Sequence, residues 1–267
     1  MKLVITEPLG ISEAQAEALK KEYLPQELEM VYCNTPPQDD AEKAARAKGA
    51  ELVMLANMPF KENVLQELSD VKFLSVAFTG VDHVAMDYCK AHDIVVSNCS
   101  GYANEAVSEL AIGLAIGLYR KMLAADEAVR AGKTRAGLLG IELSGKKFGV
   151  VGAGAIGRRT IALAQAFGCE VYYYNRKEAK IDGAKYVSLD ELMEVSDIVS
   201  LHVPDLPSTR WMIGAKEIAA LKPGAIFINA SRGTVVEIEP LAQAIKSGKL
   251  LGAAVDVFPS EPKSNKD

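Results

Sequence analysis

The sequence predicts an α/β protein with two parallel-sheet domains, and three observations support this fold class. First, its 267 residues exceed the roughly 150 residues of a typical single domain. Second, short β-type runs alternate with amphipathic helical stretches in both halves of the chain, as in parallel sheets covered by helices. Third, a long helical pattern rich in Ala, Leu and Ile, from Asn104 to about Arg130, separates the two series.

The first series occupies residues 1–98 and begins with the run KLVIT at Lys2. Ser12 and Gln15, three residues apart, are typical of a capping box and predict the start of a helix. Further strands are expected at ELEMVYC from Glu27, ELVML from Glu51, FLSVA from Phe73 and IVVSN from Ile94. Because helical patterns fill the gaps between these runs, we expect a parallel sheet.

The second series occupies residues 99–267 and opens with the connector, which we expect to be one long helix. From Lys146 the expected elements are KKFGVVG, a helix over 155–167, CEVYYY, a helix near Leu189, DIVSLHV, AIFINA, a helix after Glu237 and LLGAAVDV. We place the domain boundary near residue 98, where IVVSN gives way to the connector.

Two glycines, Gly113 and Gly117, lie four residues apart on one face of the connector helix. Small residues in that arrangement allow a second helix to approach closely. The partner is either a second copy of the chain, in a dimer, or another helix of the same chain.

Composition excludes several classes of protein. A formal net charge of -5 gives no electrostatic footprint for nucleic acid or for an anionic membrane. Glu7 and Pro8 interrupt the first apolar run too early for a signal peptide, and no apolar stretch reaches the roughly 18 residues of a membrane span. The four cysteines form no C-x-x-C pair and no metal-ligand spacing. We therefore expect a cytoplasmic protein with a small-molecule partner and no metal site.

Three glycines form the pattern G-x-G-x-x-G directly after the strand KKFGVV: Gly152, Gly154 and Gly157. In this setting the first glycine permits a tight turn, the second lets the backbone approach a pyrophosphate, and the third brings the helix close to the strand. The helix that starts within the motif adds free N–H groups and a partial positive charge. The motif predicts a dinucleotide-binding loop.

Asn175 follows the next strand, 23 residues after Gly152 (175 − 152), where dinucleotide-binding folds usually place an acid for the adenosine ribose. Here the position is neutral and Arg176 and Lys177 follow it. Two cations would attract a 2′-phosphate, which favours NADP. The alternative is NAD, with Asn175 bonding a 2′-hydroxyl and the two cations forming a solvated turn.

Together these motifs resemble the D-isomer-specific 2-hydroxyacid dehydrogenases. The resemblance rests on VGAGAIGRRTIALAQAFG from Val151, LMEVSDIVSLHVPDLPSTRWMIG from Leu192, LKPGAIFINASRGTVVE from Leu221 and GAAVDVFPSEP from Gly252, and extends to FTGVDHVAMDYCKAHDIVVSN from Phe78. It implies a flavodoxin-like substrate domain over 1–98 and a Rossmann dinucleotide-binding domain over 99–267, facing each other across a cleft. It also implies a homodimer and hydride transfer between a nicotinamide cofactor and a small 2-keto or 2-hydroxy acid.

The resemblance assigns cofactor contacts to residues at the ends of the second-domain strands. They are Ala155, Ile156, Asn175, His202, Val203, Pro204, Thr209, Ala230, Ser231 and Asp256. Arg232, in INASRG, matches the family's substrate-binding arginine. A guanidinium can bind a carboxylate and the adjacent carbonyl in a fixed plane, and it can stabilise negative charge that grows on the carbonyl oxygen.

Glu261, in FPSEP, matches the carboxylate that pairs with the family's acid–base histidine. That histidine lies in a P-H-x-G-type motif beyond the Glu-Pro dipeptide, and no residue of this sequence matches it. His83, His92 and His202 all fall where the resemblance assigns something else. We expect the sequence to be part of a longer enzyme; the alternative is a natural short form that binds dinucleotide but reduces little.

Substrate candidates follow two strands of the first domain: Thr79 and Gly80 after FLSVA, and Asn57 after ELVML. Backbone N–H groups there could receive the carboxylate of a short acid such as glyoxylate, hydroxypyruvate, pyruvate or glycerate. Two other functions use the same scaffold. One is a formate or phosphite dehydrogenase, which reads another anion, and the other is a dinucleotide-sensing regulator without turnover.

Overall fold

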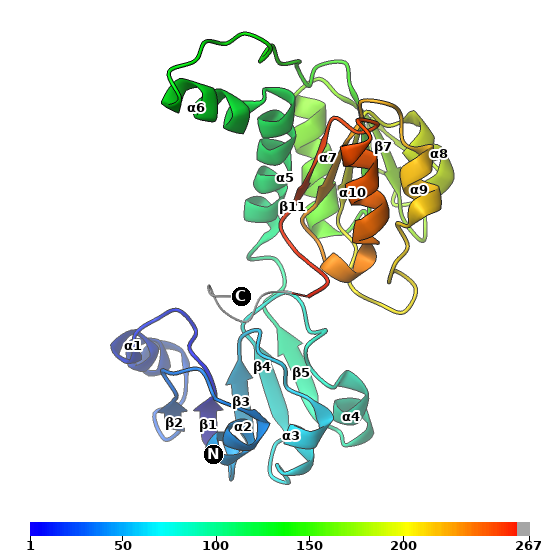
Figure 1. Cartoon of the computed structure of the whole chain (residues 1–267). Coiled ribbons are helices and arrows are strands. Elements are labelled where there is room, and N and C mark those ends of the chain that lie inside the picture. The colour runs from blue at the N-terminus through cyan, green and yellow to red at the C-terminus, as the bar shows by residue number, and fades with distance from the viewer. Residues whose placement is uncertain (261–267) are drawn as a thin grey trace. The chain divides into compact units, whose positions relative to one another are not determined.

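A computed structural model describes residues 1–260 and contains two compact units, of which the first is Met1–Tyr102 and the second begins at Ala103. Each unit has its own parallel sheet and its own hydrophobic core (Figure 1). The predicted α/β class with two parallel sheets is confirmed.

The first unit is built around a five-stranded sheet in the order β2-β1-β3-β4-β5, which is the flavodoxin-like order. Its strands are β1 (Lys2–Ile5), β2 (Glu29–Tyr32), β3 (Leu52–Leu55), β4 (Phe73–Val76) and β5 (Val95–Asn98). Its helices are α1 (Glu13–Tyr23), α2 (Asp40–Ala47), α3 (Glu62–Gln66) and α4 (Met86–Ala91). The capping box is confirmed, since Ser12 caps α1 and the side chain of Gln15 accepts from the Ser12 N–H.

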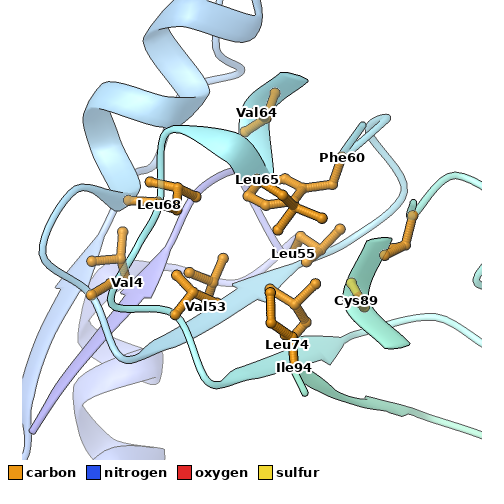
Figure 2. Close-up of a cluster of buried hydrophobic side chains, with 14 of the residues drawn as sticks. Val4, Val53, Leu55, Phe60, Val64, Leu65, Leu68, Leu74, Cys89 and Ile94 are labelled. Carbon is orange, nitrogen blue, oxygen red and sulfur yellow. The ribbon is translucent and has the colours of Figure 1, made fainter. Parts of the chain in front are cut away.

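Apolar side chains from both the sheet and the helices fill the core of the first unit (Figure 2). Val53, Leu55 and Leu74 come from the central strands, while Phe60 and Leu65 come from α3 and the loop before it. Alternate residues of β3 and β4 are buried on this face, which is the period-2 pattern of a strand. The core therefore fixes β3 and β4, and with them the loops that follow their carboxyl ends.

The second unit has a six-stranded sheet in the order β11-β10-β9-β6-β7-β8, the classic order of a dinucleotide-binding fold. The strands are β6 (Lys147–Val151), β7 (Glu170–Tyr174), β8 (Ala184–Tyr186), β9 (Ile198–Leu201), β10 (Ile226–Asn229) and β11 (Gly252–Val255). The helices are α5 (Asn104–Tyr119), α6 (Met122–Arg130), α7 (Ala155–Ala166), α8 (Leu189–Val195), α9 (Ala215–Ala220) and α10 (Ile238–Lys246), with a 3₁₀ turn over Gly233–Val235. Strand order reverses between β6 and β9, and ligands of such sheets bind beside that point.

The expected single connector helix is wrong, because the structure forms two helices, α5 and α6. Lys121 adopts a left-handed conformation (φ 51°) between them. The carbonyl of Tyr119 accepts a hydrogen bond from the N–H of Ile141 at 3.0 Å, a residue of the returning loop. The Lys121 side chain also donates to the carbonyl of Gly137 at 3.0 Å. Neither a glycine nor a proline marks the break in the sequence. It is held instead by residues 16 or more positions away.

The internal-contact explanation for the connector glycines is also wrong. A Cβ added at Gly113 or Gly117 would meet no atom within 4 Å. No other helix of the described chain packs against these two positions closely enough to require glycine.

Within residues 1–260, no helix is both long enough and apolar enough to cross a bilayer.

Candidate functional site

The glycine-rich loop connects β6 to α7 at the switch point of the second sheet. Gly152 has φ 99°, and a Cβ there would lie 2.5 Å from the carbonyl oxygen of His202. A Cβ on Gly157 would lie 1.9 Å from the carbonyl oxygen of Gly152. These contacts leave no room for side chains, so both positions require glycine.

Gly154 differs from the two glycines that flank it. It is exposed, its backbone is extended (φ -72°, ψ -165°), and a Cβ there would meet no atom within 4 Å. No side chain caps α7, which begins with Ala155 and Ile156. The open space therefore lies at the N-terminus of a helix, where first-turn N–H groups and the helix dipole favour a phosphate. A dinucleotide pyrophosphate fits this cradle.

Candidate cofactor residues cluster at the carboxyl ends of neighbouring strands. Because β6, β9, β10 and β11 are adjacent and parallel, the residues that follow them emerge at one edge of the sheet. They are the glycine loop after β6, His202, Val203 and Pro204 after β9, Ala230, Ser231 and Arg232 after β10, and Asp256 after β11. The structure thus brings most of the predicted second-domain residues to the same edge.

His202 is held in its neutral form. Its Nε2 lies 2.9 Å from the hydroxyl oxygen of Ser200, and its Nδ1 is buried without a hydrogen-bond partner among the described residues. Burial lowers the pKa of the imidazole from 6.5 to about 4. At neutral pH the ring is therefore an uncharged imidazole and not an imidazolium acid, and the backbone carbonyl oxygen of His202 packs on Gly152.

Thr209 is buried and organises the loop after β9. Its hydroxyl donates to the carbonyl of Pro204 at 2.6 Å and accepts from the N–H of Leu206 at 2.9 Å. These bonds close the turn that carries Pro204, so the side chain shapes the rim of the site.

A polar side chain that the sequence analysis did not identify fixes the backbone around Arg232. Asn229 is fully buried at the end of β10 and donates to the carbonyl of Arg232 at 2.9 Å. Its amide oxygen accepts from the N–H and the hydroxyl of Ser231, at 3.0 and 2.8 Å. The guanidinium of Arg232 is half-buried and donates to the carbonyl of Ser231 at 2.9 Å. An asparagine at the end of a buried strand was the available signal.

Arg176 and Lys177 are exposed immediately after β7, next to the glycine loop. Asn175 donates from its side chain to the carbonyl of Lys177 at 3.1 Å, which tightens the turn. Neither cation forms a salt bridge with another described residue. Their charges face solvent, where an anion can reach them.

The first-unit candidates lie after adjacent strands. Asn57 is exposed in the loop after β3, and Thr79 and Gly80 follow β4, which pairs with β3. The Asn98 side chain donates to the carbonyl of Thr79 at 2.6 Å, and the Thr79 hydroxyl donates to the carbonyl of Cys99 at 3.3 Å. Glu261 lies outside the described residues. Among residues 1–260, no group of three or more His, Cys, Asp or Glu side chains is placed to hold a metal ion.

Comparison with known proteins identifies similar sequences. A profile described as "D-isomer specific 2-hydroxyacid dehydrogenase, NAD binding domain" matches residues 112–267. The chain is 44% identical to D-3-phosphoglycerate dehydrogenase of Haemophilus influenzae over 69% of its own length and 46% of the relative. It is 36% identical to glyoxylate reductase of Thermococcus litoralis over 81% of its own length and 69% of the relative. The chain therefore spans about half the length of the phosphoglycerate dehydrogenases that it matches.

Solved structures of similar fold match nearly the whole chain. An acyclic imino acid reductase in complex with NADPH and D-Arg matches with a TM-score of 0.90 at 27% identity, over 99% of this chain and 85% of that one. D-Lactate dehydrogenase from Aquifex aeolicus, complexed with NAD and lactic acid, matches with a TM-score of 0.84 at 29% identity, over 97% of this chain and 78% of that one.

Proposed function

Since this chain belongs to the D-isomer-specific 2-hydroxyacid dehydrogenase family, we propose that it transfers a hydride between a nicotinamide cofactor and a small 2-keto or 2-hydroxy acid. The observation that carries the proposal is the open cradle at Gly154, placed at the switch point of the second sheet. When bound, the dinucleotide supplies the hydride to, or accepts it from, the carbon that bears the substrate oxygen.

The proposed dinucleotide site uses residues that follow five strands of the second unit, β6, β7, β9, β10 and β11. The backbone of Gly152 to Ile156 would hold the pyrophosphate, and Asn175 would bond the adenosine ribose. The remaining cofactor contacts are assigned to His202, Val203, Pro204, Thr209, Ala230, Ser231 and Asp256. The backbone carbonyl of His202 packs against Gly152 of the glycine loop, and its buried ring is uncharged at neutral pH.

Arg232 is proposed to bind the substrate carboxylate and to polarise the neighbouring carbonyl. Asn229 holds the backbone of Ser231 and Arg232, which limits the positions that the guanidinium can occupy. A guanidinium oriented in advance stabilises the negative charge that develops on the carbonyl oxygen. Glu261 keeps its proposed role as the partner of an acid–base imidazole.

The first unit is proposed to bind the substrate, with Asn57, Thr79 and Gly80 near its carboxylate. The positions of these residues support this assignment, because they follow the adjacent strands β3 and β4.

NADP is proposed as the preferred dinucleotide, with NAD as the alternative. Arg176 and Lys177 are exposed cations beside the ribose position, and a 2′-phosphate would pair with them. The solved relatives contain either form, NADPH in the imino acid reductase and NAD in the lactate dehydrogenase. Separate titrations with NADPH and NADH distinguish the two.

A homodimer is proposed, with α6 and the loop after it at the interface. α6 buries none of its residues, and its neighbourhood exposes Met122, Leu123, Val129 and Leu139. A Cβ added at Gly113 or Gly117 of α5 would also meet no described atom within 4 Å. Apolar surface of this kind is covered in stable oligomers, and a second copy would present the same patch in return.

A cytoplasmic location is proposed because all four cysteines are free thiols, which suits a reducing compartment.

The proposed function is tested on the complete gene product, which is mixed either with NADPH and glyoxylate, hydroxypyruvate or pyruvate, or with NADP and glycerate. The absorbance of the nicotinamide band is then followed. Consumption of NADPH with at least one keto acid is expected. Dinucleotide binding without turnover on any acid would contradict the proposal and favour a sensor.

A further inference from the structure

A buried carboxylate in the first unit has no part in the proposed chemistry. Glu7 follows β1 and is only 3% exposed. One of its oxygens, Oε1, accepts hydrogen bonds from the N–H of Ala56 at 2.5 Å and from the N–H of Met58 at 3.2 Å. These two residues flank Asn57, which remains exposed. The carboxylate thus holds the loop on both sides of a candidate substrate residue.

The surroundings of Glu7 oppose and support its charge at once. Burial raises the pKa of the carboxyl, while the backbone N–H groups of residues 56–58 and the charge of Lys43 lower it. Lys43 is itself buried, and its Nζ donates to Asp40 at 2.9 Å and to the carbonyl of Pro59 at 2.8 Å. Two buried side chains of opposite charge therefore hold the loop. Glu7 binds the N–H groups of Ala56 and Met58, and Lys43 binds the carbonyl of Pro59.

Buried ions are a poor way to gain stability, because apolar side chains of similar volume often stabilise a protein equally well. What Glu7 provides is position: its bonds fix the backbone of Ala56 and Met58, so the side chain of Asn57 emerges in one direction. The neighbouring loop after β4 carries Thr79 and is fixed in a similar way by Asn98.

We propose that Glu7 is a positioning residue that holds the loop of Asn57 in the shape that receives the substrate carboxylate. The inference rests on the proposed function. It predicts that the length and hydrogen-bonding geometry of the side chain matter more than its charge, since a single oxygen makes both bonds.

Two substitutions separate reach from charge. Glu7→Asp keeps the charge but is one methylene too short to make both bonds, so the KM for glyoxylate should rise about tenfold or more, with kcat nearly unchanged. Glu7→Gln loses the charge but keeps an oxygen at the same reach, so the KM should stay close to that of the wild type. The Kd for NADPH should not change in either variant.

Glu51→Gln and Glu51→Asp are the matched controls. Glu51 also links β1 and β3, but at the opposite ends of the strands, where its Oε2 accepts from the N–H of Lys2 at 3.2 Å. Neither control should change the KM for glyoxylate. A KM that rises in Glu7→Gln but not in Glu7→Asp, or that rises equally in the Glu51 variants, would overturn the proposal.

Amide hydrogen exchange tests the same inference without turnover. The N–H groups of Ala56 and Met58 should exchange faster in Glu7→Asp than in the wild type or in Glu7→Gln. If the wild type reduces no keto acid, the proposed function fails. The role of Glu7 can still be decided in that case, from this exchange pattern and from the binding of oxamate in the presence of NADPH. Equal exchange in all variants would overturn it.

Discussion

Arg232 leaves the sheet at the end of β10, on backbone that the side chain of Asn229 holds in place. Orienting the proposed substrate requires a planar side chain with several hydrogen-bond donors at this position, because the substrate presents a carboxylate next to a carbonyl. Charge alone would bind the acid without orienting it.

Arg232→Lys should lower kcat/KM for glyoxylate about 10- to 100-fold, because a lysine keeps the charge but loses a charge-assisted hydrogen bond of about 1.5–3 kcal/mol. Steady-state reduction of glyoxylate by NADPH measures this. Arg130→Lys, a change at an exposed arginine of α6, serves as the control and should keep full activity. Full activity of Arg232→Lys would refute the proposed role of the guanidinium.

His202 predicts a pH dependence of stability. Its pKa is about 4 in the folded chain against 6.5 for an unperturbed imidazole, so between these values the unfolded chain binds more protons. The contribution of His202 to stability is therefore present above pH 6.5 and is lost as the pH falls toward 4. Between pH 6.5 and pH 4, the Tm of His202→Gln should fall less than the Tm of the wild type. The Tm of His92→Gln, a change at an exposed ring, should fall as much as that of the wild type. Parallel curves for all three proteins would contradict this assignment.

The sequence predicts some site residues and not others, for a physical reason. Gly152 and Gly157 belong to a local motif whose spacing predicts the turn, and the contacts at both positions require glycine. Glu7 binds backbone 49 residues away, and its importance depends on which strands pair. No local pattern reports a partner that is distant in the sequence.

At the scale of elements, alternation predicts the strands and most of the helices, but it does not predict where the connector breaks. The apolar pattern of residues 104–130 is helical on both sides of Lys121, so periodicity alone favours one helix. The break is held by Ile141 and Gly137 from a later loop. Figure 1 shows α6 and the following loop extending away from the sheet of their own unit.

Leu123→Lys tests whether a second copy covers α6. Leu123 is 81% exposed, and a charge there would be buried in the proposed dimer without a partner. Light scattering should give twice 28.6 kDa for the wild type and 28.6 kDa for the variant. Leu19→Lys, at an exposed leucine of α1, is the control and should give the same mass in solution as the wild type. A wild-type monomer, or a variant that remains dimeric, would contradict the proposed interface.

At the scale of the whole molecule, length and βα alternation predict two parallel sheets, and the structure has them. The strand orders do not follow from alternation, because they depend on which edge of the sheet each new strand joins. In the second unit the order places β6 beside β9, and this pairing brings the glycine loop next to His202 and Val203. The proposed function depends on that arrangement, with the dinucleotide bound at Gly154.

Binding of NADPH to Gly154→Ala tests this central claim most directly. The added methyl group meets no protein atom within 4 Å, so thermal stability should be unchanged, yet it would occupy the space proposed for the pyrophosphate. Overpacking of about 1–3 kcal/mol corresponds to a rise in Kd of about fivefold to more than a hundredfold, measurable by calorimetric titration. Gly113→Ala, at another glycine with open space, should bind NADPH as the wild type does. If Gly154→Ala binds NADPH as tightly as the wild type, the dinucleotide does not lie in this loop.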